Sequence, residues 1–270
     1  MAKIDRLGWV DGITFKAFGV QVGVRVNDSS ILKELIEVVP PGSKLTAAQK
    51  VDHLYSVIGY PAKSNGRTQR FSLGYWNLMR FARTRSFEQL LDQFESHVQL
   101  TVAEHAPRRV FVHAGVVGWK RRAILIPGST FSGKTTLVDE LLRAGATYYS
   151  DEYAVLDENG RVHPYPRPLG IRSQNERTKV RAEDLGADVG TRPLPIALVL
   201  ATQFKEGARW RPRQITRGKG VLELLANTVS ARQQPELALS VLPVALRSAE
   251  ILKSSRGEAR EVVKSILGLN

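Results

Sequence analysis

Apolar and polar positions alternate along the first part of the chain. Residues 12–26, GITFKAFGVQVGVRV, carry apolar side chains at every second position, which is typical of strands with one buried face. Residues 46–60, TAAQKVDHLYSVIGY, fit a short helix that ends near Gly59, and residues 63–76 fit a turn that enters a strand. The pattern therefore predicts a β-rich, mixed α+β start.

A longer helix is expected next. Residues 86–106, SFEQLLDQFESHVQLTVAEHA, repeat apolar side chains on one helical face, and Ser86 with Gln89 forms a capping-box pattern. Pro107 ends this pattern. After this helix the pattern changes to apolar strands joined by a short turn. We therefore expect residues 1–104 to form a smaller N-terminal region and residues 105–270 to form a second domain.

From about residue 105 to the end, strands alternate with helices, which predicts an α/β sheet domain. Residues 157–160, DENG, indicate a hairpin, and Gly145 is expected to cap the helix before it. The expected strands are 109–117, 121–127, 146–151 and 194–202, and the expected helices are 134–143, 220–229, 235–251 and 260–267.

A phosphate-binding motif lies between an apolar strand and an amphipathic helix. Residues 128–135, GSTFSGKT, match GxxxxGK[ST], a pattern that arises by chance in roughly one chain in a hundred of this length. The glycines let backbone N–H groups approach phosphate oxygens, the lysine binds between the β and γ phosphates, and the threonine hydroxyl binds Mg²⁺. The expected nucleotide-binding residues are Gly128, Ser129, Thr130, Phe131, Ser132, Gly133, Lys134, Thr135 and Thr136.

Two consecutive acidic residues follow at the spacing of one helix and one strand. Asp151 comes 17 residues after Lys134, so in a βαβ unit Asp151 and Glu152 reach the sheet edge that carries the phosphates. Their carboxylates are suited to hold Mg²⁺ with Thr135, or to accept a proton from an attacking hydroxyl. His113 lies on the preceding strand between apolar neighbours, and the residues alone leave open whether it is structural or catalytic.

Composition narrows the chemistry. The chain has no cysteine, which excludes zinc-thiolate sites, iron–sulfur clusters and a thiol nucleophile. No apolar run is long enough for a membrane span, so we expect a cytoplasmic protein without a membrane partner. The net charge of +13 predicts an anionic partner. Residues 205–220 are densely basic, either as a solvated loop or as a surface for an anion, but the single Trp210 makes nucleic acid an unfavoured partner.

Residues 113–152 resemble the catalytic core of the HPr kinase/phosphorylase family. The shared features are a strand histidine, a phosphate loop, a glycine after the loop helix and two consecutive acidic residues, and they correspond to His113, Lys134, Gly145, Asp151 and Glu152. The resemblance extends over residues 108–173. It implies the P-loop sheet fold shared with phosphoenolpyruvate carboxykinases, and it implies that His113 lies in the active site.

The chain also departs from that family. Glu152 stands where the family usually has a second aspartate, which could shift the geometry of proton handling, so the resemblance leaves open whether phosphorylase activity is retained. The Thr135–Thr136 pair is closer to the carboxykinase form of the loop. Residues 166–172, PRPLGIR, resemble the family's signature segment through Arg167, Leu169 and Gly170, although Tyr165 replaces a glutamate of that segment.

These observations favour an ATP-dependent kinase that phosphorylates a hydroxyl, with serine of an acidic peptide or protein as the expected acceptor. ATP or another nucleoside triphosphate and Mg²⁺ are the expected cofactors. Lys134 would hold the phosphates, Asp151 would accept the proton, His113 would hydrogen-bond the acidic pair, and Arg167 or Arg172 would steady the transferring charge. A nucleotide-binding regulator and a small-molecule kinase remain alternatives, and a homo-oligomer is left open.

Overall fold

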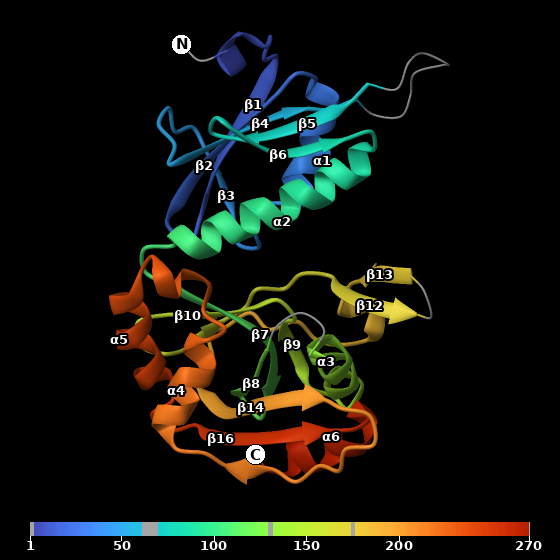
Figure 1. Cartoon of the computed structure of the whole chain (residues 1–270), viewed down its shortest axis with the longest axis vertical. Helices are drawn as coiled ribbons and strands as arrows, with labels where there is room; N and C mark the ends of the chain where they lie inside the picture. The colour runs from blue at the N-terminus through green and yellow to red at the C-terminus, as the bar shows by residue number, and fades with distance from the viewer. Residues whose placement is uncertain (1–2, 61–69, 129–131, 174–175, 270) are drawn as a thin grey trace. The chain divides into compact units, whose positions relative to one another are not determined.

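The computed structural model describes residues 3–60, 70–128, 132–173 and 176–269, with side chains described except at 3, 172, 173, 176 and 177. The chain divides into two compact units, Met1–Pro107 and Arg108–Asn270 (Figure 1). Each unit has its own sheet, and the fold is of mixed α/β class. None of the helices in the described part of the chain has the length and apolar character needed to span a bilayer.

The first unit is built on a six-stranded sheet in the order β3-β1-β2-β4-β5-β6. β2 and β4 are parallel, and the other neighbours are antiparallel. Figure 1 shows the long helix α2 against this sheet, where Phe94 and Val98 of the helix are buried together with Tyr55 of β4. The elements are β1 (Asp11–Ala17), β2 (Val20–Val26), α1 (Leu32–Glu37), β3 (Lys44–Thr46), β4 (His53–Ile58), β5 (Ser72–Trp76), β6 (Met79–Thr84) and α2 (Phe87–His105).

The sequence predictions for this unit are partly confirmed. The helix expected from Ser86 is α2, and the Ser86 hydroxyl accepts a hydrogen bond from the Gln89 N–H at 3.3 Å. The helix expected over residues 46–60 is wrong, because this segment contains the end of β3 and all of β4. Alternate side chains of β4 are buried against α2, and β4 gains a parallel partner in β2, so sheet pairing overrides local helix propensity. Residues 63–69 of the expected turn lie outside the described residues.

The second unit contains an eight-stranded sheet in the order β11-β10-β7-β8-β14-β16-β15, with β9 also paired to β7. β8, β14 and β16 are mutually parallel, whereas β7 is antiparallel to β8. The strands are β7 (Val110–Trp119), β8 (Arg122–Pro127), β9 (Thr147–Ser150), β10 (Tyr153–Leu156), β11 (Val162–His163), β14 (Ile196–Phe204), β15 (Arg213–Gln214) and β16 (Glu250–Arg256), with β12 (Leu169–Ser173) and β13 (Glu176–Val180) as a separate pair.

Helices cover both faces of this sheet, as Figure 1 shows. Ile124 and Ile126 of β8 face one core with α3 and α6, and Ala123 and Leu125 face a second core with α4 and α5. This alternation is the period of a strand buried on both sides. The helices are α3 (Lys134–Arg143), α4 (Arg217–Leu225), α5 (Pro235–Ala245) and α6 (Ala259–Gly268).

The strands predicted around the phosphate motif, the hairpin at residues 157–160 and the helix at residues 134–143 are confirmed. The helix expected over residues 235–251 is too long, because α5 ends at Ala245 and β16 begins at Glu250. In β16, Ile251 belongs to one core and Leu252 to the other, so this strand packs against the helices on both faces of the sheet while it pairs with β14. The correction matters for function, because β8, β14 and β16 all end at the same sheet edge.

Candidate functional site

The phosphate motif connects β8 to α3. Gly128 and Ser132 to Thr136 are described, whereas Ser129, Thr130 and Phe131 lie outside the described residues. Gly133 caps the N-terminus of α3 with φ of 84°, a left-handed conformation that favours glycine. The Gly128 N–H donates to the His113 carbonyl at 3.2 Å, which fixes the start of the loop against β7. The loop thus lies at the carboxyl end of β8 and at the positive end of the α3 dipole.

Lys134 is held within this loop. Its ammonium Nζ donates to the Gly128 carbonyl at 2.6 Å, and the residue is buried. Burial lowers the pKa of Lys134, and the charges of Asp151 and Glu152 oppose this shift. The cation therefore lies close to both carboxylates and to the backbone of the loop. Thr136, also predicted to bind nucleotide, is exposed on the first turn of α3.

Thr135 and Asp151 are brought into direct contact. The Thr135 hydroxyl donates to Asp151 Oδ2 at 2.8 Å, although the two residues lie on different elements. Asp151 directly follows β9, so the predicted arrival of this carboxylate at the loop edge agrees with the geometry. No group of three or more His, Cys, Asp or Glu side chains among the described residues forms a metal cage. A hydroxyl and one carboxylate suit Mg²⁺, which takes its remaining ligands from phosphates and water.

His113 and Glu152 form a second pair beside the first. The distance from His113 Nε2 to Glu152 Oε1 is 3.2 Å, and β7 places His113 opposite Tyr153 in the β7–β10 register. Burial lowers the pKa of His113; Glu152 raises this pKa and Lys134 lowers it. A neutral imidazole with its proton on Nε2 fits these neighbours, since Nε2–H then donates to the carboxylate.

Of the two predicted arginines, Arg167 is joined to the site region through Tyr148. The Arg167 carbonyl accepts from the Tyr148 hydroxyl at 2.6 Å, and Arg167 itself is half-buried. Burial raises the pKa of Tyr148, and the charge of Asp151 raises it further, whereas Arg167 acts in the opposite direction. Tyr148 therefore lies between Arg167 and Asp151. The side chain of Arg172 is outside the described residues.

Arg256 is a site residue that the sequence reasoning missed. It ends β16 and is only 1 % exposed. Its guanidinium donates from Nη2 to the Gly133 carbonyl at 2.6 Å and from Nη1 to the Gly257 carbonyl at 3.0 Å. Burial lowers the pKa of Arg256, and Glu258 opposes that effect. A buried guanidinium that contacts the phosphate loop through backbone carbonyls supplies positive charge where an anion would bind.

The signal for Arg256 was its position at the end of a strand parallel to β8. The sequence pattern predicts a helix over residues 235–251 and therefore does not indicate a strand that ends at Arg256. The neighbouring strand β14 reaches the loop as well, because the Phe204 N–H donates to the Ser132 carbonyl at 3.1 Å. The ends of β14 and β16 thus support one side of the loop, and Asp151 and Glu152 lie on the other.

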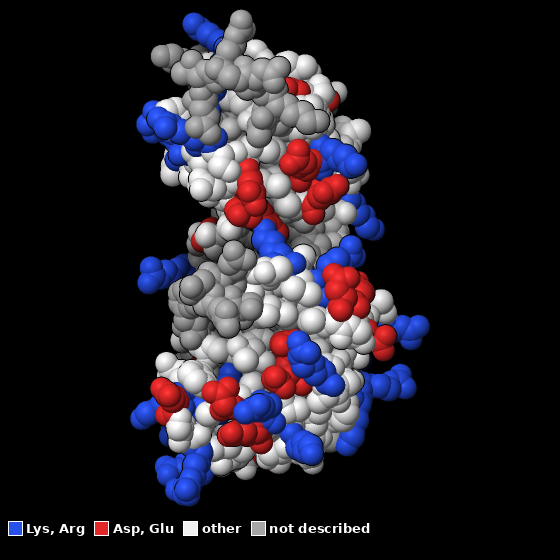
Figure 2. Space-filling view, turned by 90° about the vertical axis from the view of Figure 1, so that its right-hand side faces the viewer, with Lys and Arg blue, Asp and Glu red and all other residues white. Residues whose placement is uncertain are grey.

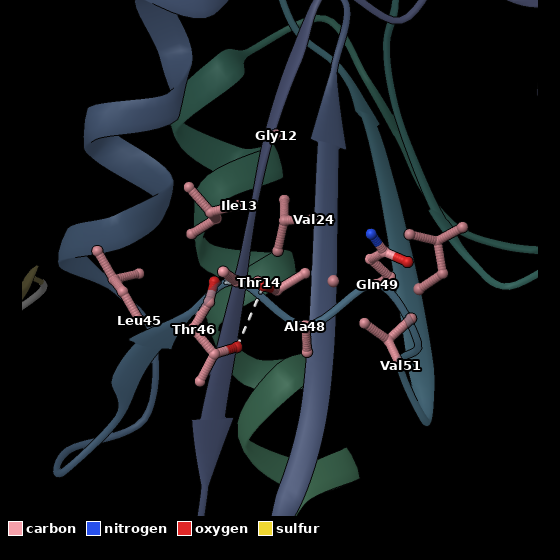
Figure 3. A pocket seen from close by; sticks show the side chains of 12 residues that line it. Gly12, Ile13, Thr14, Val24, Leu45, Thr46, Ala48, Gln49 and Val51 are labelled. Carbon is pink, nitrogen blue, oxygen red and sulfur yellow. Dashed lines mark hydrogen bonds between the residues drawn. The ribbon is translucent and has the colours of Figure 1, made fainter.

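A hollow of about 590 Å³ in the first unit has different chemistry (Figure 3). It lies over β1, β2 and β3, and the Thr14 hydroxyl donates to the Thr46 carbonyl at 2.6 Å beside it. None of its lining residues carries a charge, so it offers neither a cation for phosphate nor a carboxylate for a metal. The chemistry of the phosphate loop therefore identifies the candidate site.

No protein-family model matches the chain, and no curated protein matches it either.

Proposed function

We propose that the chain is an ATP-dependent kinase that transfers the γ-phosphoryl group to a hydroxyl, with serine of an acidic peptide or protein as the acceptor. The observation that carries the proposal is the contact between Thr135 and Asp151 at 2.8 Å, beside the buried ammonium of Lys134. A hydroxyl, a carboxylate and a lysine in this grouping match the parts that bind Mg²⁺ and a triphosphate. A turn at a sheet edge that binds no ligand does not require a hydroxyl, a carboxylate and a buried lysine in this grouping.

The cations of the site are suited to the triphosphate. Lys134 and the N-terminus of α3 act on one loop, and Arg256 adds a second buried positive charge at Gly133. Their charges act in a partly desolvated site, where electrostatic stabilisation is stronger than in water. Donors fixed before the reaction stabilise the charge that develops on the γ-phosphoryl oxygens without reorganisation.

The contacts of the two carboxylates support roles that differ from the sequence expectation, in which Asp151 accepts the proton and Glu152 assists with the metal. Asp151 contacts Thr135 and is therefore suited to hold Mg²⁺ with it. Mg²⁺ bound there would neutralise phosphate charge and orient the γ-phosphoryl group. Glu152 contacts neutral His113 instead, and the imidazole orients its carboxylate. This carboxylate is therefore suited to accept the proton of the attacking hydroxyl.

In the reaction we propose, the acceptor oxygen forms a bond to the γ phosphorus as the bond to the β–γ bridging oxygen breaks. The hydroxyl proton moves to the Glu152 carboxylate, and ADP leaves with the bridging oxygen. His113 keeps the carboxylate in position through its Nε2–H. A hydroxyl acceptor fits this site better than a carboxylate acceptor, which would need no base and would be repelled by Asp151 and Glu152.

We further infer that the second unit has the P-loop fold of the HPr kinase and phosphoenolpyruvate carboxykinase group. The inference is supported by the grouping of a strand histidine, the loop and two consecutive acidic residues at one sheet edge. Glu152 pairs with His113 and does not join Asp151 at Thr135. Because glutamate has a longer side chain than the aspartate usual in that family, the carboxylate that accepts the proton lies farther from the backbone. The reverse, phosphorylase reaction is not part of the proposal.

The test is transfer of label from [γ-³²P]ATP with Mg²⁺ to a set of acidic peptides, each made with serine or with alanine at one position. We expect labelling of serine peptides alone, resistant to acid and lost in strong alkali. Lys134→Ala is the matched inactive control. ATP that binds tightly but yields no labelled peptide or protein would favour a nucleotide-binding regulator, and turnover of a small sugar or acid alone would favour a small-molecule kinase.

A further inference from the structure

The positive charge of the chain is not gathered into one patch on the face drawn in Figure 2, where basic and acidic side chains are interspersed. Basic residues are instead concentrated in one segment of the first unit. Between Asp52 and Glu88 the sequence has no acidic residue, although it has one lysine and five arginines. This segment contains β4, β5 and β6.

β6 is an edge of the six-stranded sheet. Among the described residues it pairs with β5 alone, so one row of its backbone N–H and C=O groups faces outward. Leu78 of the preceding turn and Met79, the first residue of β6, are also exposed, at 70 % and 67 % of their full accessibility. An open edge of this kind is a template for another extended chain.

Arginines follow this edge. We define the β6 arginine patch as Arg70, Arg80, Arg83 and Arg85, all of which are exposed. Within the described part of the chain, none of the four forms an ion pair with a carboxylate. The described residues thus provide no carboxylate partner for the charge of the patch.

Aromatic rings hold three of these guanidiniums. The guanidinium carbon of Arg83 lies 4.1 Å from the centroid of the Phe71 ring, and that of Arg85 lies 5.2 Å from the same centroid. Arg70 lies 5.5 Å from the ring centroid of Tyr60. Stacking uses the faces of the guanidinium planes and leaves their N–H edges free for carboxylates. Two like charges on one ring are further stabilised by an anionic ligand.

The spacing of the arginines selects the form of that ligand. Arg83 lies near the end of β6 and Arg85 directly follows the strand, and both guanidiniums lie over the same Phe71 ring, so the two side chains are on one side of the sheet. Residues two apart on a strand are separated by about 6.7 Å. A peptide added beside β6 presents its own alternate side chains at the same interval and on the same face. Carboxylates at alternate positions would therefore meet these two arginines.

We propose that β6 binds an extended acidic peptide by strand addition, with carboxylates at alternate positions contacting Arg83 and Arg85. The inference rests on the proposed function only in taking this peptide to be the segment that carries the acceptor serine. A peptide is favoured over a nucleic acid because the open edge presents carbonyls that need N–H donors, which a phosphodiester backbone lacks.

The test uses the full chain without nucleotide and a fluorescein-labelled nine-residue peptide of alternating threonine and glutamate, measured by fluorescence anisotropy. The double variant Arg83→Glu, Arg85→Glu should weaken binding at least about tenfold, since two attractive cross-strand pairs become repulsive. Arg83→Gln, Arg85→Gln gives the milder loss of charge alone. The matched control Lys33→Glu, Lys44→Glu makes the same charge change at exposed positions on α1 and β3, and should change affinity less than about twofold.

Two further probes separate strand addition from attraction between charges. Methylation of alternate backbone nitrogens in the same peptide should abolish binding, because charge is kept while the edge hydrogen bonds are lost. Equal loss in the lysine control, undiminished binding of the methylated peptide, or tighter binding of a single-stranded oligonucleotide would each overturn the proposal. The Lys134→Ala chain should bind the peptide like the unchanged chain. Docking without phosphoryl transfer would leave this inference standing and refute the kinase proposal, and transfer without docking would do the reverse.

Discussion

Replacement of Gly133 by alanine should lower the free energy of unfolding, because it disrupts the contact between the phosphate loop and Arg256. Gly133 has φ of 84°, and an alanine in this left-handed region loses about 1–2 kcal/mol of stability. Its added Cβ would also lie 2.7 Å from Arg256 Nη2. The guanidinium must then leave the Gly133 carbonyl, and loss of such a charge-assisted hydrogen bond costs about 1.5–3 kcal/mol. The two effects together predict a loss of about 2.5–5 kcal/mol in the free energy of unfolding.

Gly145→Ala is the matched control for this prediction. Gly145 follows the same helix with φ of 94°, but no atom lies within 4 Å of its added Cβ. It should lose only the backbone contribution of about 1–2 kcal/mol. Urea unfolding of both variants, followed by far-ultraviolet circular dichroism, measures the difference.

A double-mutant cycle with Arg256→Met isolates the contact itself. In that background the added Cβ meets no guanidinium and keeps only its 3.1 Å approach to the Phe204 Cβ, so the effect of Gly133→Ala on unfolding should fall toward that of Gly145→Ala. The reasoning fails if Gly133→Ala is no more destabilising than Gly145→Ala, or if Arg256→Met leaves the effect of Gly133→Ala unchanged. Nucleotide binding measured in parallel should be lost in Gly133→Ala and kept in Gly145→Ala.

Three further predictions concern charge in and outside the site. Lys134→Ala should weaken ATP binding and abolish transfer with the fold intact, as calorimetry and circular dichroism would show, and unchanged affinity would contradict the loop assignment. Asp151→Asn should raise the Mg²⁺ concentration needed for half-maximal activity, whereas Glu152→Gln should lower kcat by about 10²-fold or more with the Mg²⁺ requirement unchanged; the opposite pattern would exchange their roles. Burial lowers the pKa values of His53 and His97, so the unfolded state binds more protons below its histidine pKa of 6.5 and stability should fall as pH drops through that value. His53→Gln, compared by urea unfolding at pH 7.5 and 5.5, should reduce this dependence, and an unchanged slope would contradict the prediction.

The local parts of the fold could be predicted from the sequence, because they depend on local physics. The Ser86 cap, the apolar face of α2 and the strand–loop–helix arrangement around Lys134 all follow from residues close together in the chain. The 17-residue spacing to Asp151 also brought its carboxylate to Thr135 as expected. The number of residues between Lys134 and Asp151 predicts their proximity because the helix and the strand between them have lengths set by their regular geometry.

The errors arose where distant strands decide the structure. Residues 53–58 form β4 because β2, far away in sequence, provides a parallel partner. Residues 250–256 form β16 beside β14 for the same reason, and this pairing delivers Arg256 to the loop. The stacking of Arg83 and Arg85 on Phe71 likewise depends on the β5–β6 hairpin, although the absence of acidic residues around it is visible in the sequence.

Phosphorus-31 NMR of a reaction mixture tests the central claim most directly. The mixture contains the full chain, ATP with Mg²⁺ and an acidic peptide with one serine. The account predicts a phosphomonoester resonance that grows together with the resonances of ADP, depends on the serine, and is absent with Lys134→Ala. Release of inorganic phosphate alone, or ATP that stays intact in the presence of every hydroxyl-bearing peptide, would contradict it.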